Sequence, residues 1–262
     1  LNLRFADVER NSFCVSLNTL KKAYTNKTKA VVVIHTYGNV FEIDKIKTWC
    51  KKKKIKLIED AAQSFGTKFN NKLSGTFGDV GAFSLHATKN ITTGEGGIIV
   101  TNKKEIAQKI QLYRSHGVSK KRYFHILPGH NFRLTNFQAA MGLAQFKKLN
   151  LTLKLRKKIY NKYLSLIEKN KFNFQFIEKK SNFIPWTLAI YPKKKQKNNI
   201  LKIIKNLYAM GIETRSGFYS ANRISFLKTN KSQIKNSDFL SQNIICLPLF
   251  VDLKQREISK IS

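Results

Sequence analysis

The chain has 262 residues, 42% of them hydrophobic, which is enough for a large domain with a buried core and a smaller second domain. Lys and Arg number 49 against 15 Asp and Glu, so the formal net charge is +34. No apolar run approaches the roughly 20 residues that a membrane-spanning helix requires, so we expect no membrane partner. The cysteines at positions 14, 50 and 246 form no CxxC pair and lack metal-ligand spacing. We therefore expect incidental thiols in a reducing cytoplasm, and no metal site.

The basic charge raises the possibility of a nucleic-acid-binding protein. Only nine of the 49 basic residues are Arg, and the lysines are spread along the whole chain. A nucleic-acid groove would instead gather Arg and aromatic side chains on one face. The composition therefore favours lysines on solvated helix faces, although a field of this sign can still steer anionic substrates.

Strand and helix patterns alternate in the first part of the chain. The β-branched run Thr28–His35 predicts a buried parallel strand, and apolar residues at positions 43, 46, 49 and 50 predict a helix. The further elements that we expect are strands at 55–59, 79–85 and 97–101 and a helix at 104–116. This alternation indicates an α/β domain with a mostly parallel sheet.

The pattern changes in the last part of the chain. Thr135 is expected to cap a helix that leads into a second helix over residues 147–169. After these we expect a strand at 187–191, a helix at 199–210, a turn and short strand at 211–215, and shorter elements up to residue 261. We therefore assign residues 1–150 to a large α/β domain and residues 151–262 to a small C-terminal α+β domain.

The most informative segment is Ser84–Gly97, which reads SLHATKNITTGEGG. Lys89 lies there among small and hydroxyl residues beside a glycine turn, where desolvation would lower the pKa of an amine and make it a nucleophile and base. Asp60 comes at the carboxyl end of a predicted strand, where open α/β sheets bind their ligands. A pyridoxal phosphate (PLP) enzyme needs both groups, because a lysine forms a Schiff base with the cofactor aldehyde and an aspartate keeps the pyridine nitrogen protonated.

Each of these residues also has a plainer interpretation. Lys89 could be a surface charge, and Asp60 could cap a helix that begins directly after it. Ser84 could satisfy a neighbouring backbone group, and His86 could be a histidine of the core. His35 ends the first predicted strand, where it could lie near a cofactor or equally be a core histidine. Lys89 lies beside the glycine turn and Asp60 lies at a strand end, and these positions favour the functional interpretation of both residues.

Together with Glu59–Gln63 (EDAAQ), the Ser84–Gly97 segment resembles the sugar-nucleotide aminotransferases of the DegT/DnrJ/StrS type, within the fold-type-I PLP enzymes. Shorter similarities extend from Phe5 to Ile258. The resemblance implies a PLP-dependent transferase fold like that of aspartate aminotransferase. It also implies the following roles: Lys89 bonds the PLP aldehyde, Asp60 holds the pyridine nitrogen, Gln63 packs against the ring, Ser84 binds the phosphate, and His86 is a second phosphate candidate.

Two further segments are similar to family signatures. Gly129–Ala140 (GHNFRLTNFQAA) implies that Asn131 reaches the cofactor phosphate of the partner subunit, and hence that the protein is a homodimer. Gly211–Arg215 with Phe218-Tyr219 resembles a motif near the sugar site. Relatives commonly continue with Pro-x-His, whereas this chain has Ser220-Ala221-Asn222, which leaves the sugar-side contacts open.

The resemblance implies an enzyme that moves an amino group from an amino acid, by family habit L-glutamate, to a nucleotide-activated keto sugar. This activity would serve polysaccharide biosynthesis. Some relatives carry histidine in place of the Schiff-base lysine and catalyse deoxygenation, so Lys89 favours transamination. The alternatives are a noncatalytic regulatory relative whose PLP site senses a ligand and, less favoured, a basic nucleic-acid-binding protein. The nucleotide, the sugar, the aminated carbon and the pathway stay open.

Relatives also carry an N-terminal phosphate loop and an aromatic residue that stacks on the PLP ring. The start of this chain, Leu1–Val8, resembles neither and has the pattern of an interior strand. We therefore expect the chain to be a fragment of a longer protein, with weakened PLP binding.

Overall fold

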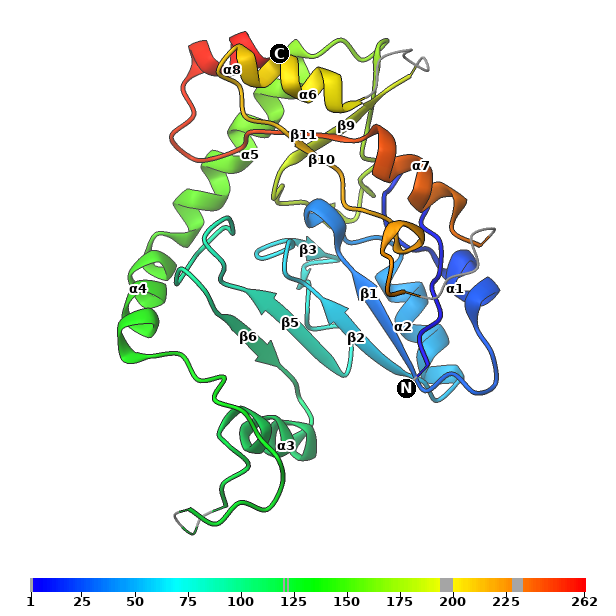
Figure 1. The fold of residues 1–262 in the computed structure, drawn as a ribbon, viewed down its shortest axis with the longest axis vertical. Coiled ribbons are helices and arrows are strands. Elements are labelled where there is room, and N and C mark those ends of the chain that lie inside the picture. The colour runs from blue at the N-terminus through cyan, green and yellow to red at the C-terminus, as the bar shows by residue number, and fades with distance from the viewer. Residues whose placement is uncertain (1, 120, 122, 194–199, 228–232) are drawn as a thin grey trace.

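A computed structural model describes residues 2–119, 121, 123–193, 200–227 and 233–262 (Figure 1). Its helices are α1 (Leu17–Ala23), α2 (Ile43–Lys52), α3 (Lys104–Arg114), α4 (Asn136–Lys147), α5 (Leu149–Leu166), α6 (Ile200–Ala209), α7 (Lys235–Asn243) and α8 (Gln255–Ile261). Its strands are β1 (Ala30–Ile34), β2 (Lys56–Asp60), β3 (Lys68–Phe69), β4 (Lys72–Leu73), β5 (Val80–Ser84), β6 (Gly97–Val100), β7 (Phe172–Phe174), β8 (Ser181–Asn182), β9 (Leu188–Pro192), β10 (Arg215–Ser216) and β11 (Ile245–Leu247).

The first sheet has the strand order β1-β2-β5-β6. β1, β2 and β5 run parallel, and β6 pairs antiparallel with β5 after the glycine turn. The prediction of an α/β domain with a mostly parallel sheet is therefore confirmed. The carboxyl ends of the three parallel strands point toward the second sheet (Figure 1).

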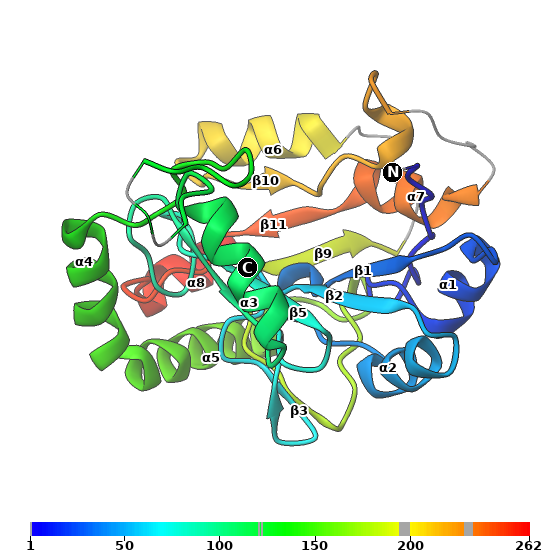
Figure 2. The same cartoon turned by 90° about the horizontal axis from the view of Figure 1, so that it is seen from below.

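Only one face of the first sheet is covered within the described chain. α1 and α2 lie together beside β1 and β2 (Figures 1 and 2), and Val31, Val33 and Leu57 pack there against apolar residues of α2. On the other face Val32 is 55% and Ile34 is 49% exposed. The predicted parallel strand is present as β1, but the prediction that it is buried was wrong for every second residue, because its side chains alternate between a covered and an open face.

The predicted strand at the start of the chain was also wrong. Residues 2–8 form no strand, and Leu1 lies outside the described residues. The Asp7 carboxylate instead accepts hydrogen bonds from the backbone N–H groups of Asn236 (2.9 Å) and Ser237 (2.8 Å) at the start of α7. Asp7 thus satisfies donors that the first turn of a helix leaves unpaired, and this ties the segment to α7 rather than to a sheet.

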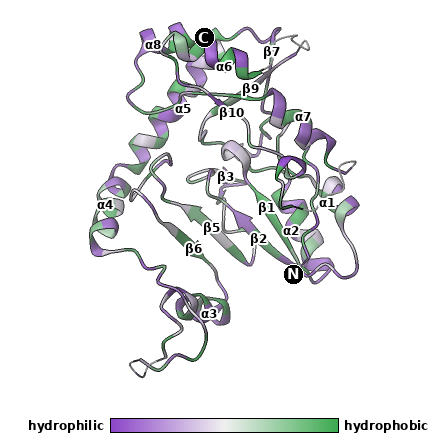
Figure 3. Ribbon diagram, in the orientation of Figure 1, coloured by the Kyte–Doolittle hydropathy of each residue, from purple (hydrophilic) through white to green (hydrophobic). Residues whose placement is uncertain are grey.

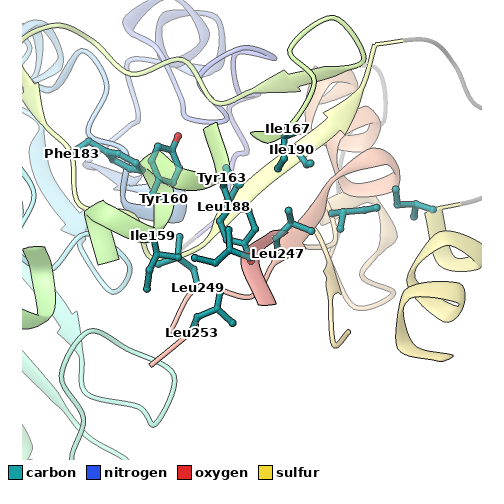
Figure 4. Close-up of a cluster of buried hydrophobic side chains, with 13 residues drawn as sticks. Ile159, Tyr160, Tyr163, Ile167, Phe183, Leu188, Ile190, Leu247, Leu249 and Leu253 are labelled. Atoms are coloured by element: carbon teal, nitrogen blue, oxygen red, sulfur yellow. The ribbon is translucent and has the colours of Figure 1, made fainter. Parts of the chain in front are cut away.

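The second sheet has the order β10-β11-β9-β7, and its neighbouring strands are antiparallel. A buried cluster joins it to α5 and α8, with Tyr163, Leu188 and Leu247 among its members (Figure 4). The small α+β unit expected in the C-terminal part is thus present. Its helix α6 agrees with the predicted helix at 199–210, of which Asn199 lies outside the described residues.

Hydrophobic residues make up most of β1, β5 and β6, whereas the helices alternate between hydrophobic and hydrophilic residues (Figure 3). Within the described ranges, no helix combines the length and the apolarity needed to cross a lipid bilayer. The segment between α3 and α4 extends away from both sheets (Figure 1). Phe132 and Phe137, in this segment and at the start of α4, are 71% and 74% exposed.

Candidate active site

The candidate site begins at the carboxyl ends of β2 and β5. Asp60 ends β2 and is paired in register with Ala82 of β5, so both residues belong to the open face of the sheet. Ser84 lies two residues beyond Ala82 and therefore points to the same face. The sheet thus presents a carboxylate and a hydroxyl on the same face, which the helices leave uncovered.

Lys89 follows in the turn after β5. Its backbone N–H donates to the carbonyl of His86 at 2.9 Å, and its side chain is half-buried. Burial lowers the pKa of the Lys89 amine below its ordinary value, while the Asp60 carboxylate acts in the opposite direction. The Asp60 carboxylate thus lies near enough to the Lys89 amine to favour its protonated form.

A wall of stacked aromatic rings closes one side of this site. The Lys89 Nζ lies 4.3 Å from the centre of a Trp186 ring. Trp186 in turn is stacked with Tyr37 (6.3 Å between centroids, 4° between planes) and with Phe218 (6.3 Å, 15°). Trp186 is not among the residues predicted from sequence, because an aromatic residue just before a strand is typical of an ordinary core.

Asp60 does not cap a helix. Residues 61–66 form turns, and Asp60 Oδ1 accepts a hydrogen bond from the backbone N–H of Ala62 at 3.0 Å. Gln63 therefore lies in a turn rather than one helical turn beyond Asp60. Its Oε1 accepts from the backbone N–H of Tyr37 at 2.6 Å and so supports Tyr37 in a left-handed conformation with φ of 58°.

Ser84 and His86 both have local partners. The Ser84 Oγ accepts from the His86 backbone N–H at 3.2 Å, as the plainer interpretation of Ser84 expects, and its hydroxyl hydrogen can still donate. The His86 side chain is 45% exposed, so His86 is not a core histidine. Its Nδ1 lies 3.0 Å from Thr88 Oγ1 and its Nε2 lies 3.6 Å from Glu95. The role of either residue toward a phosphate stays a prediction.

His35, by contrast, belongs to the covered side of the sheet. Its Nε2 lies 2.9 Å from Glu59 Oε2, and both side chains are buried. Glu59 also accepts hydrogen bonds from the backbone N–H groups of Gly75 (2.8 Å), Phe77 (2.5 Å) and Gly78 (2.6 Å). The core interpretation of His35 is thus correct, and Glu59 is the buried carboxylate that holds the loop between β4 and β5.

Burial alone would raise the pKa of Glu59. The His35 imidazole and the amides of Gly78 and Gly75 outweigh it, so the pKa lies below its ordinary value of 4.5. Because the folded-state pKa is lowered, this carboxylate stabilises the fold above pH 4.5, and the contribution is lost as the pH falls through the folded-state value.

Removing this carboxylate should be costly. Glu59→Ala leaves two buried N–H groups, one partly buried N–H group and His35 without their acceptor, so we expect the free energy of unfolding to fall by about 3–5 kcal/mol. Urea denaturation at pH 7 measures the change. The control Glu213→Ala removes a carboxylate that is 71% exposed and should change the value by less than about 0.5 kcal/mol. Equal losses in the two variants would contradict the assigned role of Glu59.

Asn131 contacts residues of its own segment. It forms a β-bridge with Ser115, and its Oδ1 accepts from Arg133 Nε at 3.3 Å. The side chain is exposed. Among the described residues, no direct contact links Asn131 to Lys89 or Asp60 within one chain.

The sugar-side departure from the family motif has a structural partner. The Asp238 carboxylate of α7 accepts from Ser220 Oγ and, at 2.6 Å, from Asn222 Nδ2. Phe218, two residues before Ser220, stacks on Tyr37 with 5.7 Å between ring centroids. The third family segment therefore reaches the aromatic wall of the site, with Asp238 binding the residues that replace Pro-x-His.

The groups that meet here match the needs of PLP. Lys89 supplies a partly desolvated amine, Asp60 a carboxylate for a pyridinium N–H, and Ser84 a hydroxyl for a phosphate. The glycine turn that follows has φ values of 78° at Gly94 and 144° at Gly96, which glycine adopts readily. The donor set and the open sheet face can therefore accommodate a flat, anionic aldehyde cofactor.

Comparison with known proteins supports this chemistry. The sequence profile of the DegT/DnrJ/EryC1/StrS aminotransferase family matches residues 2–262. The chain is 32% identical to GDP-perosamine synthase of Vibrio cholerae over 266 residues, which cover 98% of this chain and 71% of that protein.

Two solved structures share the fold. Helicobacter pylori PseC, an aminotransferase of pseudaminic acid biosynthesis, superposes with a TM-score of 0.87 at 27% identity, over 98% of this chain and 71% of that one. Escherichia coli GDP-4-keto-6-deoxy-D-mannose-3-dehydratase with bound hydrated PLP gives 0.88 at 26% identity, over 98% and 72%. The predicted PLP-transferase fold is confirmed, and the chain belongs to the DegT/DnrJ/EryC1/StrS aminotransferase family.

Proposed function

We propose that the protein is a PLP-dependent aminotransferase that transfers an amino group from an amino acid, by family habit L-glutamate, to a nucleotide-linked keto sugar. The observation that carries this proposal is the position of Asp60 at the carboxyl end of β2, in register with β5, whose following turn holds the half-buried Lys89. Family membership and the names of the relatives support the same reaction class.

PLP, when bound, supplies an aldehyde that carries the amino group and a ring that accepts electron density from the reacting carbon. Asp60 would hold the ring nitrogen in its protonated form, and Ser84, with His86 as a second candidate, would hold the phosphate. Gln63, whose Oε1 accepts from the Tyr37 backbone N–H, would pack against the ring.

Lys89 would then act on the substrate. Its pKa is lowered by burial, so a larger fraction of its amine is neutral near pH 7 and can accept a proton from the reacting carbon. The same Nζ can return the proton at the next step. Because the aromatic wall covers one side of the amine, proton transfer takes place in a site partly shielded from water.

The rival functions are less well supported. Against a noncatalytic regulatory relative stands the presence of both Lys89 and Asp60, which such a protein would not need. Against a nucleic-acid-binding protein stands the distribution of the lysines, which lie at exposed positions on many elements of the described chain. The direct test is an assay with L-glutamate and a panel of GDP- and UDP-linked 4-keto sugars, with mass detection of the aminated product. Failure with every sugar, together with ligand binding at the PLP site, would favour the regulatory alternative.

We further propose a cytoplasmic homodimer with a role in polysaccharide biosynthesis, in which residues 1–150 form the large domain and residues 151–262 the small one. The free cysteines support a reducing compartment. The exposed side chains of Phe132 and Phe137 support an intersubunit contact, because large apolar groups of this kind commonly mark interfaces.

Mixed dimers test whether Asn131 completes the partner subunit's site. Lys89→Ala and Asn131→Asp should each inactivate the enzyme, the second because a carboxylate would repel the cofactor phosphate. After subunit exchange, one site of the mixed dimer carries both changes and the other carries neither. We therefore expect up to half of the sites in mixed dimers to regain activity, measured after mixing the two purified variants.

The control mixes Lys89→Ala with Asp60→Asn, since both residues lie in one chain's site and no intact site can form. Confirmed subunit exchange without recovery in the Asn131 experiment would mean that Asn131 acts within its own chain or not at all.

A further inference from the structure

Trp186 is held more firmly than a surface aromatic residue would be. Its indole Nε1 donates to the Thr88 carbonyl at 2.9 Å, and its backbone N–H donates to the Tyr37 carbonyl at 3.1 Å. Its own carbonyl accepts from Arg156 Nη2 at 2.5 Å. With Tyr37 and Phe218 stacked in near-parallel planes beside it, the indole has little freedom to turn away.

Arg156 strengthens this hold from the protein interior. It is only 6% exposed, and its Nε donates to the Pro185 carbonyl at 3.2 Å. Burial lowers the pKa of Arg156 to about 10. A buried guanidinium is costly, so its hydrogen bonds to the two carbonyls around Trp186 indicate that the position of this segment is under strong constraint.

The Lys89 Nζ lies 4.3 Å from the centre of a Trp186 ring, within the range of a cation–π interaction, and Trp has the strongest π-face for a cation. Thr88, which bonds the indole N–H, is the neighbour of Lys89 in sequence. The indole therefore contacts the Lys89 side chain and is hydrogen-bonded to the backbone of the residue before Lys89.

We propose that Trp186 is a positioning residue for Lys89, and that its indole face holds the Lys89 ammonium whenever that amine is not bonded to the cofactor. The use of this interaction in catalysis rests on the proposed function, since the lysine of an aminotransferase must be released and recaptured in each cycle.

Two effects of the indole oppose each other and make the claim testable. The π-face favours the ammonium and raises the pKa of Lys89, whereas the shielding of Lys89 from water lowers it. Asp60 faces the amine from the end of β2 and favours the ammonium, and the Arg156 guanidinium lies behind the Trp186 backbone. If Trp186 holds the ammonium, its removal lowers the pKa of Lys89; if it only shields the amine, its removal raises the pKa.

Competitive acetylation of the cofactor-free protein measures this directly. Acetic anhydride labelling across pH, read by mass spectrometry on the Lys89 peptide, gives the pKa of one lysine among many. We expect Trp186→Leu to lower the Lys89 pKa by about half a unit to one unit, and Trp186→Phe by less. The control Trp49→Phe changes the other tryptophan of the chain, in α2, and should leave Lys89 unchanged. An unchanged or raised pKa in Trp186→Leu would overturn the proposal.

Fluorescence gives a second readout in a protein with an intact Trp186. In Trp49→Phe, emission comes from Trp186 alone, and its intensity should change as Lys89 loses its proton. The change should be lost when Lys89→Met is added, and its persistence there would contradict the proposal. Neither measurement uses cofactor or substrate, so a failed transamination assay would leave this inference standing, and the reverse holds as well.

Discussion

Lys89→Ala should abolish transamination, with a loss of at least about 10³-fold in turnover, because one amine is both the nucleophile and the proton carrier. Lys89→Arg should be equally inactive, since a guanidinium keeps the positive charge but stays protonated. Stopped-flow absorbance with L-glutamate measures the first half-reaction. Borohydride treatment of the unmodified enzyme with PLP should fix the cofactor on the peptide that contains Lys89.

The matched control is Lys21→Ala, which removes an exposed lysine of α1 and should retain full activity. Attachment of the cofactor to any other lysine, or turnover by Lys89→Arg, would exclude Lys89 as the reacting amine.

Asp60→Asn should slow both half-reactions by about 10²-fold or more while the protein stays folded and binds PLP. The amide oxygen of asparagine can still accept the hydrogen bond from Ala62, so the turn after β2 is kept. A neutral amide no longer favours a protonated ring, and the reacting carbon then loses its electron sink. Single-turnover rates with saturating cofactor isolate this effect from binding.

The same variant has a consequence that needs no cofactor. The Asp60 carboxylate raises the pKa of Lys89, so Asp60→Asn should shift the pH midpoint of Lys89 acetylation downward. Asp252→Asn, which neutralises an exposed carboxylate, should leave both the rates and the midpoint as they are. Unimpaired single-turnover rates in Asp60→Asn would mean that Asp60 only stabilises the turn after β2 and has no role in the reaction.

The features that sequence analysis predicts well are those that depend on neighbours along the chain. The capping box of Thr135 with Gln138, the strands on either side of the glycine turn and the place of Asp60 at a strand end all follow from local patterns. The family resemblance then connects Lys89 with Asp60, whose carboxylate raises the pKa of Lys89.

The remaining features depend on which distant segments meet. Trp186 lies almost a hundred residues from Lys89, and no periodicity indicates that its ring would cover the amine. The sequence also does not indicate which face of β1 is open, because Val31 and Val32 are the same residue type and differ only in whether α2 packs over them. The residues after Asp60 form turns instead of the helix that the plainer interpretation of Asp60 allowed, and Asp60 accepts from the Ala62 amide there.

The opposite orientations of Glu59 and Asp60 make β2 unusually intolerant of insertion or deletion. A slip of one residue in its pairing would turn the reactive-site carboxylate inward and send the loop-holding carboxylate to the open face, since successive side chains of a strand alternate. A single insertion or deletion in β2 would thus impair both the stability of the fold and the catalytic activity. Variation in chain length among related proteins should therefore collect in the loops that flank β2 and spare the strand itself.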